Sequence, residues 1–457
     1  MPPAARTAPG QLGLFPELPR LDLAPEWKQQ QRLWGHSFHP MCSYLAMFPA
    51  GLAHAFIARY SRPGDVVLDP FSGRGTTPLQ ACAEGRFGLG LDLNPFAHLL
   101  TAAKVEPPTR GQAEARLAHL RIDWSLEAPR WIELAAAGQA APGPGGVSVP
   151  GPRGAEAAPL PVEVALCFHP RTLAQLLFVR SSLDLGQPTD RFLAAATAGI
   201  LHGRSASYLS DVMPNSFSMA PRYVRDYVAR RGFRATERDV FASLGAKLRR
   251  LYRQGLPAVP GMALLGDALQ VAELADEALR RRAQPERARL VVTSPPYLRV
   301  VKYGYYNWLR LWFLGIDPAA VDRRLDDAHQ LDAYLAFLRR VLAGLRDVLT
   351  DDAVVALVIG DVESDRGKRI EGGVGLAETV WERAAELEGY RLAGVVVDDI
   401  AAGRKLTRIW GREAGQATKT DRILVLAPTE AGRRRALAGA ATPIDWSWPP
   451  PEARAFA

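Results

Sequence analysis

The sequence predicts an α/β fold in which a mostly parallel sheet is covered by helices and interrupted by a large, mainly helical insertion. Two strand–turn–helix units follow each other between residues 65 and 103, and the same rhythm returns after residue 260. The stretch between these regions has helical periodicity and no comparable run of strands. Strands that alternate with helices are typical of parallel sheets whose two faces are both covered.

The composition is that of a folded globular protein. The chain has 457 residues, of which 48% are hydrophobic, enough to bury a large core. It has no uninterrupted apolar run of about 18 residues and no signal-peptide pattern at its start, so we expect a soluble, cytoplasmic protein. The cysteines Cys42, Cys82 and Cys167 are widely spaced, which indicates packing rather than a disulfide framework, and no metal site is expected.

The first two units each place an acid at the end of a buried strand. The run Asp65–Asp69 ends in a carboxylate and leads through a glycine-rich turn into a helix expected over Thr76–Glu84. The run Phe87–Asp92 repeats this pattern, and a further helix is expected over Asn94–Ala103.

The insertion is expected over residues 106–260, between the first part of the sheet domain (1–105) and its second part (261–457). Residues 135–160 are rich in Gly, Pro and Ala and predict a flexible loop. A helix with a capping-box-like start is expected from Thr236–Asp239. Its apolar face comprises Val240, Phe241, Leu244, Leu248 and Leu251.

Positive charge is concentrated in the insertion. Residues 161–260 contain 14 Lys or Arg against 7 Asp or Glu, in a chain whose formal charge is +8. An excess of this kind suits a polyanionic partner.

The second part of the sheet domain continues the sheet. Strands are expected at Ala263–Asp267, at Leu290–Thr293 and at Ala353–Ile359, with closing strands at Arg391–Val397 and Arg422–Leu426. Helices are expected over Ala278–Arg282 and Asp332–Leu349.

The glycine turn Asp69-Pro-Phe-Ser-Gly-Arg-Gly-Thr-Thr77 lies where a parallel sheet opens its ligand crevice. A dinucleotide fingerprint would need a third glycine at position 78, which is Pro78, so a pyrophosphate-binding turn is disfavoured. Asp92, at the end of the next strand, is placed to accept hydrogen bonds from ribose hydroxyls. A glycine-rich turn beside a solvated acid remains the alternative.

The tetrapeptide Ser294-Pro-Pro-Tyr297 follows a buried strand, and its two prolines make a rigid edge. An exocyclic amine conjugated to a base ring is a poor nucleophile. The Ser294 hydroxyl and the Pro295 carbonyl can accept its two protons in hydrogen bonds, which brings the nitrogen lone pair out of conjugation. Tyr297 offers a flat face on which an extruded base can stack.

The glycine turn and the SPPY edge together resemble the DNA methyltransferases that methylate an amino nitrogen, either N4 of cytosine or N6 of adenine. The resemblance implies S-adenosylmethionine (SAM) as cofactor and a Rossmann-like class I methyltransferase fold with a seven-stranded mixed sheet. It further implies that Pro49–Pro63 packs beside the methionine moiety, that Asp92 holds the ribose, and that Asp267 meets the adenine amino group. The residues that would border the methionine end are Asp69, Phe71, Gly73, Gly75, Thr76 and Thr77.

The same resemblance bears on the target base and the partner. SPPY is commoner among the cytosine-N4 enzymes of this family, so we expect N4 of cytosine, with adenine N6 as the alternative. The partner would be double-stranded DNA with the target base flipped out of the helix, and a cognate restriction endonuclease is a further implied partner. RNA or protein amide methylation stays open as a related activity, and a non-catalytic nucleic-acid-binding subunit as one of another class.

The insertion is the candidate for target recognition. Residues 202–222 are dense in small polar and aromatic groups, a composition suited to base edges or to an ordinary structured loop. The candidate DNA-binding residues are Arg204, Asn215, Arg222 and Arg225. Past the SPPY edge, Trp308 and Trp312 have helical spacing that favours core packing, whereas Tyr303 and Tyr305 are candidates for the wall of the base pocket. Asp361, after a strand end, is a candidate neighbour of the target base, with a solvated loop acid as the alternative.

Overall fold

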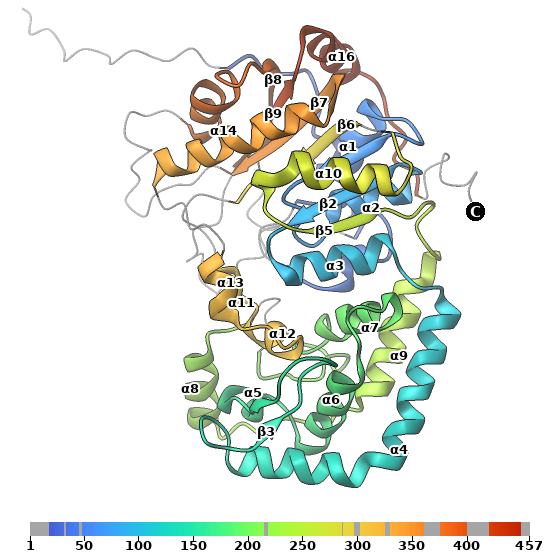
Figure 1. Cartoon of the computed structure of the whole chain (residues 1–457), viewed down its shortest axis with the longest axis vertical. Helices are drawn as coiled ribbons and strands as arrows, with labels where there is room; N and C mark the ends of the chain where they lie inside the picture. Colours follow the sequence, from blue (N-terminus) through green and yellow to red (C-terminus); the bar gives the residue numbers. More distant parts are fainter. Residues whose placement is uncertain are drawn as a thin grey trace, which may run out of the picture.

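The computed structural model describes residues 18–31, 33–44, 48–213, 218–285, 287–296, 302–324, 330–360, 375–399 and 420–448. Tyr297, Asn215 and Asp361, three of the residues singled out above, lie outside this set. The molecule has two lobes, with the sheet domain at one end and a helical lobe at the other (Figure 1).

The sheet domain contains a seven-stranded mixed sheet in the order β5-β2-β1-β6-β7-β9-β8. Its strands are β1 (Val66–Asp69), β2 (Phe87–Asp92), β5 (Met262–Leu265), β6 (Ala288–Thr293), β7 (Leu349–Gly360), β8 (Arg391–Asp399) and β9 (Thr420–Ala427). The first five strands in the spatial order pair in parallel, and β9 pairs antiparallel with both β7 and β8. The expected seven-stranded mixed sheet is therefore confirmed.

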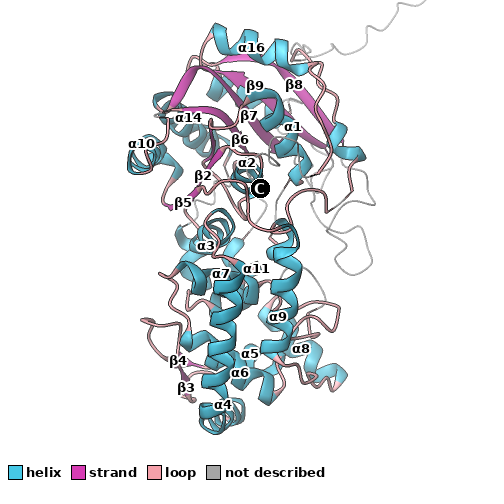
Figure 2. Cartoon of the chain, turned by 90° about the vertical axis from the view of Figure 1, so that its right-hand side faces the viewer, coloured by secondary structure: helices cyan, strands magenta, loops and turns pink. Residues whose placement is uncertain are grey.

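Helices cover both faces of this sheet because its strands are apolar on both faces. The helices of this domain are α1 (Ala50–Tyr60), α2 (Thr76–Ala83), α3 (Pro95–Val105), α10 (Val271–Arg281), α14 (Leu331–Asp347), α15 (Leu376–Val380) and α16 (Glu430–Ala440). One core joins α10, α14 and α15 to Val66 and Leu68 of β1. The core on the other face joins α1 and α16 to Val67. Figure 2 shows these helices on either side of the strands.

The helical lobe is an excursion from the sheet domain between β2 and β5. It contains α4 (Arg110–Ala140), α5 (Val162–Cys167), α6 (Pro170–Ser182), α7 (Pro188–Ala198), α8 (Pro221–Arg231), α9 (Val240–Leu251) and the two-stranded pair β3 (Ser148–Val149) and β4 (Ala158–Pro159). Its two ends meet, because the Gly261 N–H donates to the Val105 carbonyl over 2.9 Å. The excursion therefore leaves and re-enters the sheet domain at one point.

Two local expectations in this lobe need correction. The loop expected from residue 135 begins later, because α4 continues to Ala140, and within the expected loop β3 pairs with β4. The helix expected to start at Thr236 begins at Val240 with Asp239 as its N-cap, since the Asp239 carboxylate accepts the Ala242 N–H over 2.7 Å. An N-cap carboxylate satisfies a helix N–H that has no partner within the helix.

A second chain segment completes the helical lobe. Helices α11 (Tyr303–Tyr306), α12 (Trp308–Phe313) and α13 (Pro318–Arg324) follow the SPPY edge in sequence, yet their apolar residues belong to the core of the lobe. Trp308 is 6% exposed, and its indole N–H donates to the Met219 carbonyl over 2.7 Å. The core packing expected for Trp308 is confirmed. Residues 303–324 were expected to belong to the sheet domain, within residues 261–457. In the structure they pack in the helical lobe instead.

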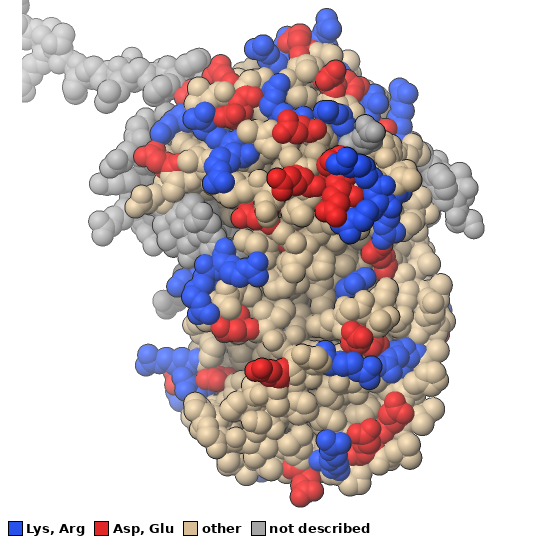
Figure 3. Space-filling model, in the orientation of Figure 1, with Lys and Arg blue, Asp and Glu red and all other residues tan. Residues whose placement is uncertain are grey.

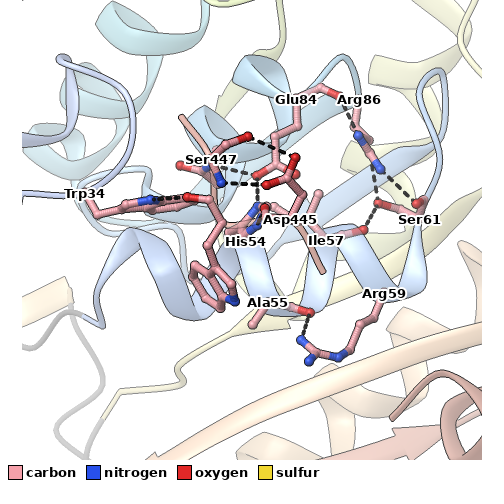
Figure 4. Close-up of polar contacts among 12 residues, drawn as sticks. Trp34, His54, Ala55, Ile57, Arg59, Ser61, Glu84, Arg86, Asp445 and Ser447 are labelled. Carbon is pink, nitrogen blue, oxygen red and sulfur yellow. Dashed lines mark hydrogen bonds and ion pairs between the residues drawn. The ribbon is translucent and has the colours of Figure 1, made fainter. Parts of the chain in front are cut away.

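The chain ends of the described structure pack together on the sheet domain. His54 of α1 lies between the Glu84 carboxylate, at 2.8 Å, and the Asp445 carbonyl, at 3.0 Å (Figure 4). Trp34 and Trp446 pack against the same imidazole ring. Among the described residues, no helix combines the length and the apolar character required to cross a membrane.

Candidate active site

The glycine turn is shaped by two residues with positive φ. Gly75 has φ +75°, and a Cβ there would lie 2.8 Å from the Thr101 hydroxyl oxygen, so a side chain is excluded. Gly73 has φ +51°, and a Cβ there would meet nothing closer than the Tyr44 ring at 3.6 Å. A side chain at Gly73 would therefore meet only ordinary van der Waals contacts, and the glycine is required by the positive φ rather than by a clash.

Hydrogen bonds from the Asp69 carboxylate stabilise this turn. Its carboxylate Oδ1 accepts the Phe71 N–H over 3.1 Å and the Thr293 hydroxyl over 2.6 Å, which joins β1 to β6. Asp69 is 1% exposed, and its burial raises the pKa of its carboxyl to about 7. In this structure Asp69 supports the turn and presents almost no surface to a ligand.

The other turn residues divide into a buried and a surface group. Thr76 and Thr77 are buried, and the Thr77 hydroxyl donates to the Val292 carbonyl over 2.8 Å. Phe71 and Gly73 are half-buried, with the Phe71 ring against Phe337. Of the six residues expected beside the methionine end, Phe71 and Gly73 are therefore the ones with the most surface.

Asp92 ends β2 beside the turn. Its Oδ2 accepts the Gly73 N–H over 2.8 Å and its Oδ1 accepts the Asn94 N–H over 2.9 Å. Each oxygen keeps a further lone pair, and the side chain is half-buried, so hydroxyl donors can still reach it. Burial raises the pKa of Asp92 to about 6.

Two tyrosines, Tyr44 and Tyr303, lie next to Asp92, and their contact was not predicted from the sequence. Asn94 donates its Nδ2 proton to the Tyr44 hydroxyl over 3.0 Å, and the Tyr44 ring stacks on Tyr303 with centroids 5.7 Å apart. Burial and the nearby Asp92 charge raise the pKa of both phenols. Tyr303 had been a candidate for the base pocket, and here its partner is Tyr44. Tyr44 belongs to no recognisable sequence motif, so local sequence patterns could not identify it as a site residue.

Cationic side chains connect the glycine turn to the neighbouring chain segments. The Lys104 ammonium donates to the Arg74 carbonyl over 2.6 Å, and the Arg74 guanidinium donates to the His39 carbonyl over 3.1 Å. Lys247 of α9 donates to the neighbouring Pro40 carbonyl over 2.9 Å. Burial lowers the pKa of Arg74 to about 10 and that of Lys247 to about 8. The helical lobe and the glycine turn are thus joined through the segment at His39 and Pro40.

Asp267 follows β5, the strand beside β2. Its Oδ1 accepts the Leu269 N–H over 2.9 Å, while the Gly266 N–H donates to the Asp92 carbonyl over 3.1 Å. The half-buried Asp267 keeps its second carboxylate oxygen available as an acceptor.

The SPPY edge follows β6 on the other side of β1. The Ser294 hydroxyl donates to the Val358 carbonyl of β7 over 3.2 Å. Pro295 is buried, and Ser294 and Pro296 are half-buried. Because β5, β2, β1 and β6 are consecutive and parallel, Asp267, Asp92, the glycine turn and Ser294 all lie along the same carboxyl edge of the sheet.

The candidate DNA-binding residues lie in the helical lobe. Arg204 is exposed in a loop, and Arg222 and Arg225 are exposed on α8. His202, Ser210 and Ser218, from the same region, are buried. These three side chains therefore form the interior of a structured loop rather than a surface that meets a base edge.

Comparisons with known proteins point to one family. Residues 24–103 match the N6/N4 methyltransferase family model, described as DNA methylase. Type II methyltransferase M.MjaII from Methanocaldococcus jannaschii is 35% identical over 71 residues, which is 16% of this chain and 13% of that protein. Type II methyltransferase M.SmaI from Serratia marcescens is 35% identical over 77 residues, 17% of this chain and 26% of that protein.

Type II methyltransferase M.Cfr9I from Citrobacter freundii is 34% identical over 70 residues, 15% of this chain and 23% of that protein. The matches thus span about a quarter or less of the length of these curated relatives. Among solved structures, the rRNA methyltransferase aviRa from Streptomyces viridochromogenes aligns over 92% of this chain and 96% of its own, at 11% identity and a TM-score of 0.34. A likeness this low has no bearing on fold or substrate.

The family match covers the segment with α1, the glycine turn and Asp92, which is the segment in which most of the expected SAM-binding residues lie. Residues 24–103 therefore match the N6/N4 DNA methylase family. This match confirms the resemblance to that family over this part of the chain.

Proposed function

We propose that the protein is a SAM-dependent DNA methyltransferase that methylates an exocyclic amino nitrogen, and that its target is N4 of cytosine. The observation that carries this proposal is the shared carboxyl edge, where Asp92, Asp267, the glycine turn and the SPPY edge occur at the ends of consecutive strands. The family match supports the cofactor half of this edge, and Ser294 lies outside the matched residues.

The residues of the edge suit SAM by their donor and acceptor chemistry. Asp92, a half-buried residue, offers the remaining lone pairs of its carboxylate to the ribose hydroxyls, and Gly73 places no Cβ between the backbone and a ligand. Asp267 offers an acceptor to the adenine amino group. When bound, SAM would supply an electrophilic methyl group on a sulfonium centre.

The chain's own contribution to the reaction is to prepare the amine. Because the Ser294 hydroxyl gives its proton to the Val358 carbonyl, its lone pairs are left to accept from the target amine. The Pro295 carbonyl is the second acceptor in this proposal, and Tyr297 is the stacking face for the flipped base. Two accepted hydrogen bonds hold the amine out of conjugation with its ring and direct its lone pair to the methyl donor.

The preference for cytosine rests on Ser294, because SPPY is commoner among the cytosine-N4 enzymes of the family that the chain resembles. A carboxylate at this position would face the Val358 carbonyl oxygen, and two acceptors in contact repel each other, so the site suits a hydroxyl. Adenine N6 is the alternative target. A restriction-modification role, with a cognate restriction endonuclease, follows from the type II methyltransferases that the chain resembles.

The deciding experiment is methylation of mixed-sequence DNA with labelled SAM, followed by mass spectrometry of the nucleosides. N4-methylcytosine is the expected product. N6-methyladenine would refute the choice of base and keep the chemistry, and label found only in RNA or protein would refute DNA as the substrate. Tight DNA binding without SAM binding would favour a non-catalytic subunit.

A further inference from the structure

Helix α8 is an unusually exposed element of the helical lobe. Val224 is its single buried residue among the eleven residues of the helix, all of which the structure describes. Its outward face carries Arg222, Arg225 and Arg230, all exposed. Partly buried side chains of α8 also pack against the lobe core, whereas the charged outward face of the helix is turned to solvent.

The start of α8 is attached to the segment that follows the SPPY edge. The Ser218 N–H donates to the Tyr306 carbonyl of α11 over 2.9 Å, and the Met219 carbonyl accepts the Trp308 indole N–H over 2.7 Å. The basic face of α8 therefore begins beside the chain that leaves the candidate base site.

Helix α13 brings a second group of arginines to the same segment. The Asp322 carboxylate accepts the N–H groups of Gly304 and Tyr305, over 2.7 and 3.0 Å, so its charge is directed into α11. Arg323 and Arg324, at the end of α13, are exposed. Figure 3 shows Lys and Arg side chains gathered at the edge of the molecule that carries α13 and α8.

Two of the ion pairs that these arginines make are weak and exposed. Arg222 lies 4.0 Å from Asp226 and Arg323 lies 3.3 Å from Asp317, with all four side chains more than half exposed. Exposed ion pairs of this kind are worth about 0 to 1 kcal/mol, so a phosphate can replace the acid at little cost. The third pair is less exposed: Arg225 pairs with Glu163 at 3.3 Å, and the Arg225 side chain is 53% exposed whereas that of Glu163 is 16% exposed.

We propose that α8 and α13 form one basic rim, made of Arg222, Arg225, Arg230, Arg323 and Arg324, that binds the phosphate backbone of double-stranded DNA beside the target base. The identity of the partner rests on the proposed function. Arginine forms charge-assisted hydrogen bonds with phosphate oxygens, and contacts of this kind fix the position of the duplex without reading its sequence. The rim thus combines arginines of the insertion, on α8, with arginines of the segment after the SPPY edge, on α13, and both groups would hold the duplex in place.

The test compares three double variants of the full chain. Arg222→Gln with Arg230→Gln changes α8, and Arg323→Gln with Arg324→Gln changes α13. Arg433→Gln with Arg434→Gln on α16 is the control, since Arg433 also pairs with an acid, Glu430 at 2.8 Å, and Arg434 is also exposed. All three variants remove two positive charges, and α16 lies at the opposite end of the molecule (Figure 1).

The measurement is the dissociation constant for a mixed-sequence DNA duplex at several salt concentrations, together with SAM affinity in the absence of DNA. Each rim variant should lower the slope of log affinity against log salt by about 2, because each lost phosphate contact removes about 0.9. The control should keep the parent slope, and all three should keep the parent affinity for SAM.

A parent-like slope in either rim variant would overturn the single rim. A larger loss for duplex RNA than for duplex DNA would overturn DNA as its occupant. Because binding needs no methyl transfer, a protein that methylates nothing but loses salt-dependent DNA binding in both rim variants would keep the rim and refute the proposed function.

Discussion

Ser294 shows how one hydroxyl can be prepared for its task by a neighbouring strand. Its proton is directed to the Val358 carbonyl, so Ser294→Ala removes an acceptor without removing any contact to the glycine turn. We expect methyl transfer to fall on the order of 10²-fold, the effect typical of losing one preorganised hydrogen bond at a reacting group, with SAM affinity unchanged. Single-turnover rates and SAM titrations measure the two quantities.

The matched control for this variant is Ser210→Ala, since the Ser210 hydroxyl also donates to a backbone carbonyl, that of Cys167, but within the helical lobe. An equal loss of rate in both variants would show that Ser294 acts through stability alone. Full activity of Ser294→Ala would remove it from the chemistry.

Asp92 makes the cofactor side of the site sensitive to pH. Burial raises the pKa of its carboxyl to about 6, so at lower pH the group carries a proton and can no longer accept from two ribose hydroxyls at once. We expect SAM affinity to be constant above pH 7 and to weaken as the pH falls through about 6. Calorimetric titration between pH 5 and 8 measures this dependence.

Asp92→Asn is the comparison for that titration, because an amide does not titrate in this range. It should bind SAM more weakly at pH 8 and show no step near pH 6. A step of the same size in the variant would assign the titration to another group.

At the scale of the element, the place of α12 depends on a buried cation from another helix. Arg180 of α6 is 5% exposed, and its Nε donates to the Trp312 and Phe313 carbonyls over 3.1 and 3.2 Å. The guanidinium also donates to the Pro150 carbonyl and lies 4.9 Å from the centroid of the Trp312 ring. A cation that caps the last carbonyls of a helix favours its C-terminus.

Arg180→Met should therefore lower the free energy of unfolding by about 2 to 4 kcal/mol, since hydrogen bonds to a charged group contribute about 1.5 to 3 kcal/mol. Arg180→Lys should recover only part of this, because an ammonium cannot reproduce the planar guanidinium contacts. Urea denaturation measures both. Arg171→Met, on the exposed side of the same helix, is the control and should change stability little. Equal effects at the two positions would contradict the capping role.

At the scale of the whole molecule, the helical lobe is built from two chain segments. Trp308, Leu309, Leu311 and Phe313 come from the segment after the SPPY edge and are buried against the insertion. A chain in which residues 107–259 are replaced by a short glycine linker can close without strain, because Val105 and Gly261 are already hydrogen-bonded. It would still expose these four side chains to water.

We expect that shortened chain to aggregate, since each large apolar side chain that stays buried is worth about 1.5 to 3 kcal/mol. A chain that also lacks residues 303–324 should be monodisperse by size-exclusion chromatography. A soluble, folded product from the first deletion alone would show that α11–α13 do not need the insertion.

Local patterns in the sequence were enough to predict the carboxyl edge. An apolar run that ends in an acid, a glycine turn and two prolines are each encoded by neighbouring residues, and this is why Asp69, Asp92 and Ser294 could be placed at strand ends before any contact was known. The weaker predictions were those that relied on composition. Residues 135–140 show no helical spacing of apolar residues in the sequence. They nevertheless continue α4, in which Ala135 and Gly138 are buried.

The sequence by itself thus determined the order of strands and helices along the chain and the chemistry of the residues at the strand ends, because these depend on neighbours a few positions apart. Only the tertiary structure decided that Thr293 binds Asp69, that Tyr44 stacks on Tyr303 and that residues 303–324 join the helical lobe. The physical reason is that these contacts form when burial brings together side chains far apart in the chain, 224 positions in the case of Thr293 and Asp69, and no local periodicity records such a partner.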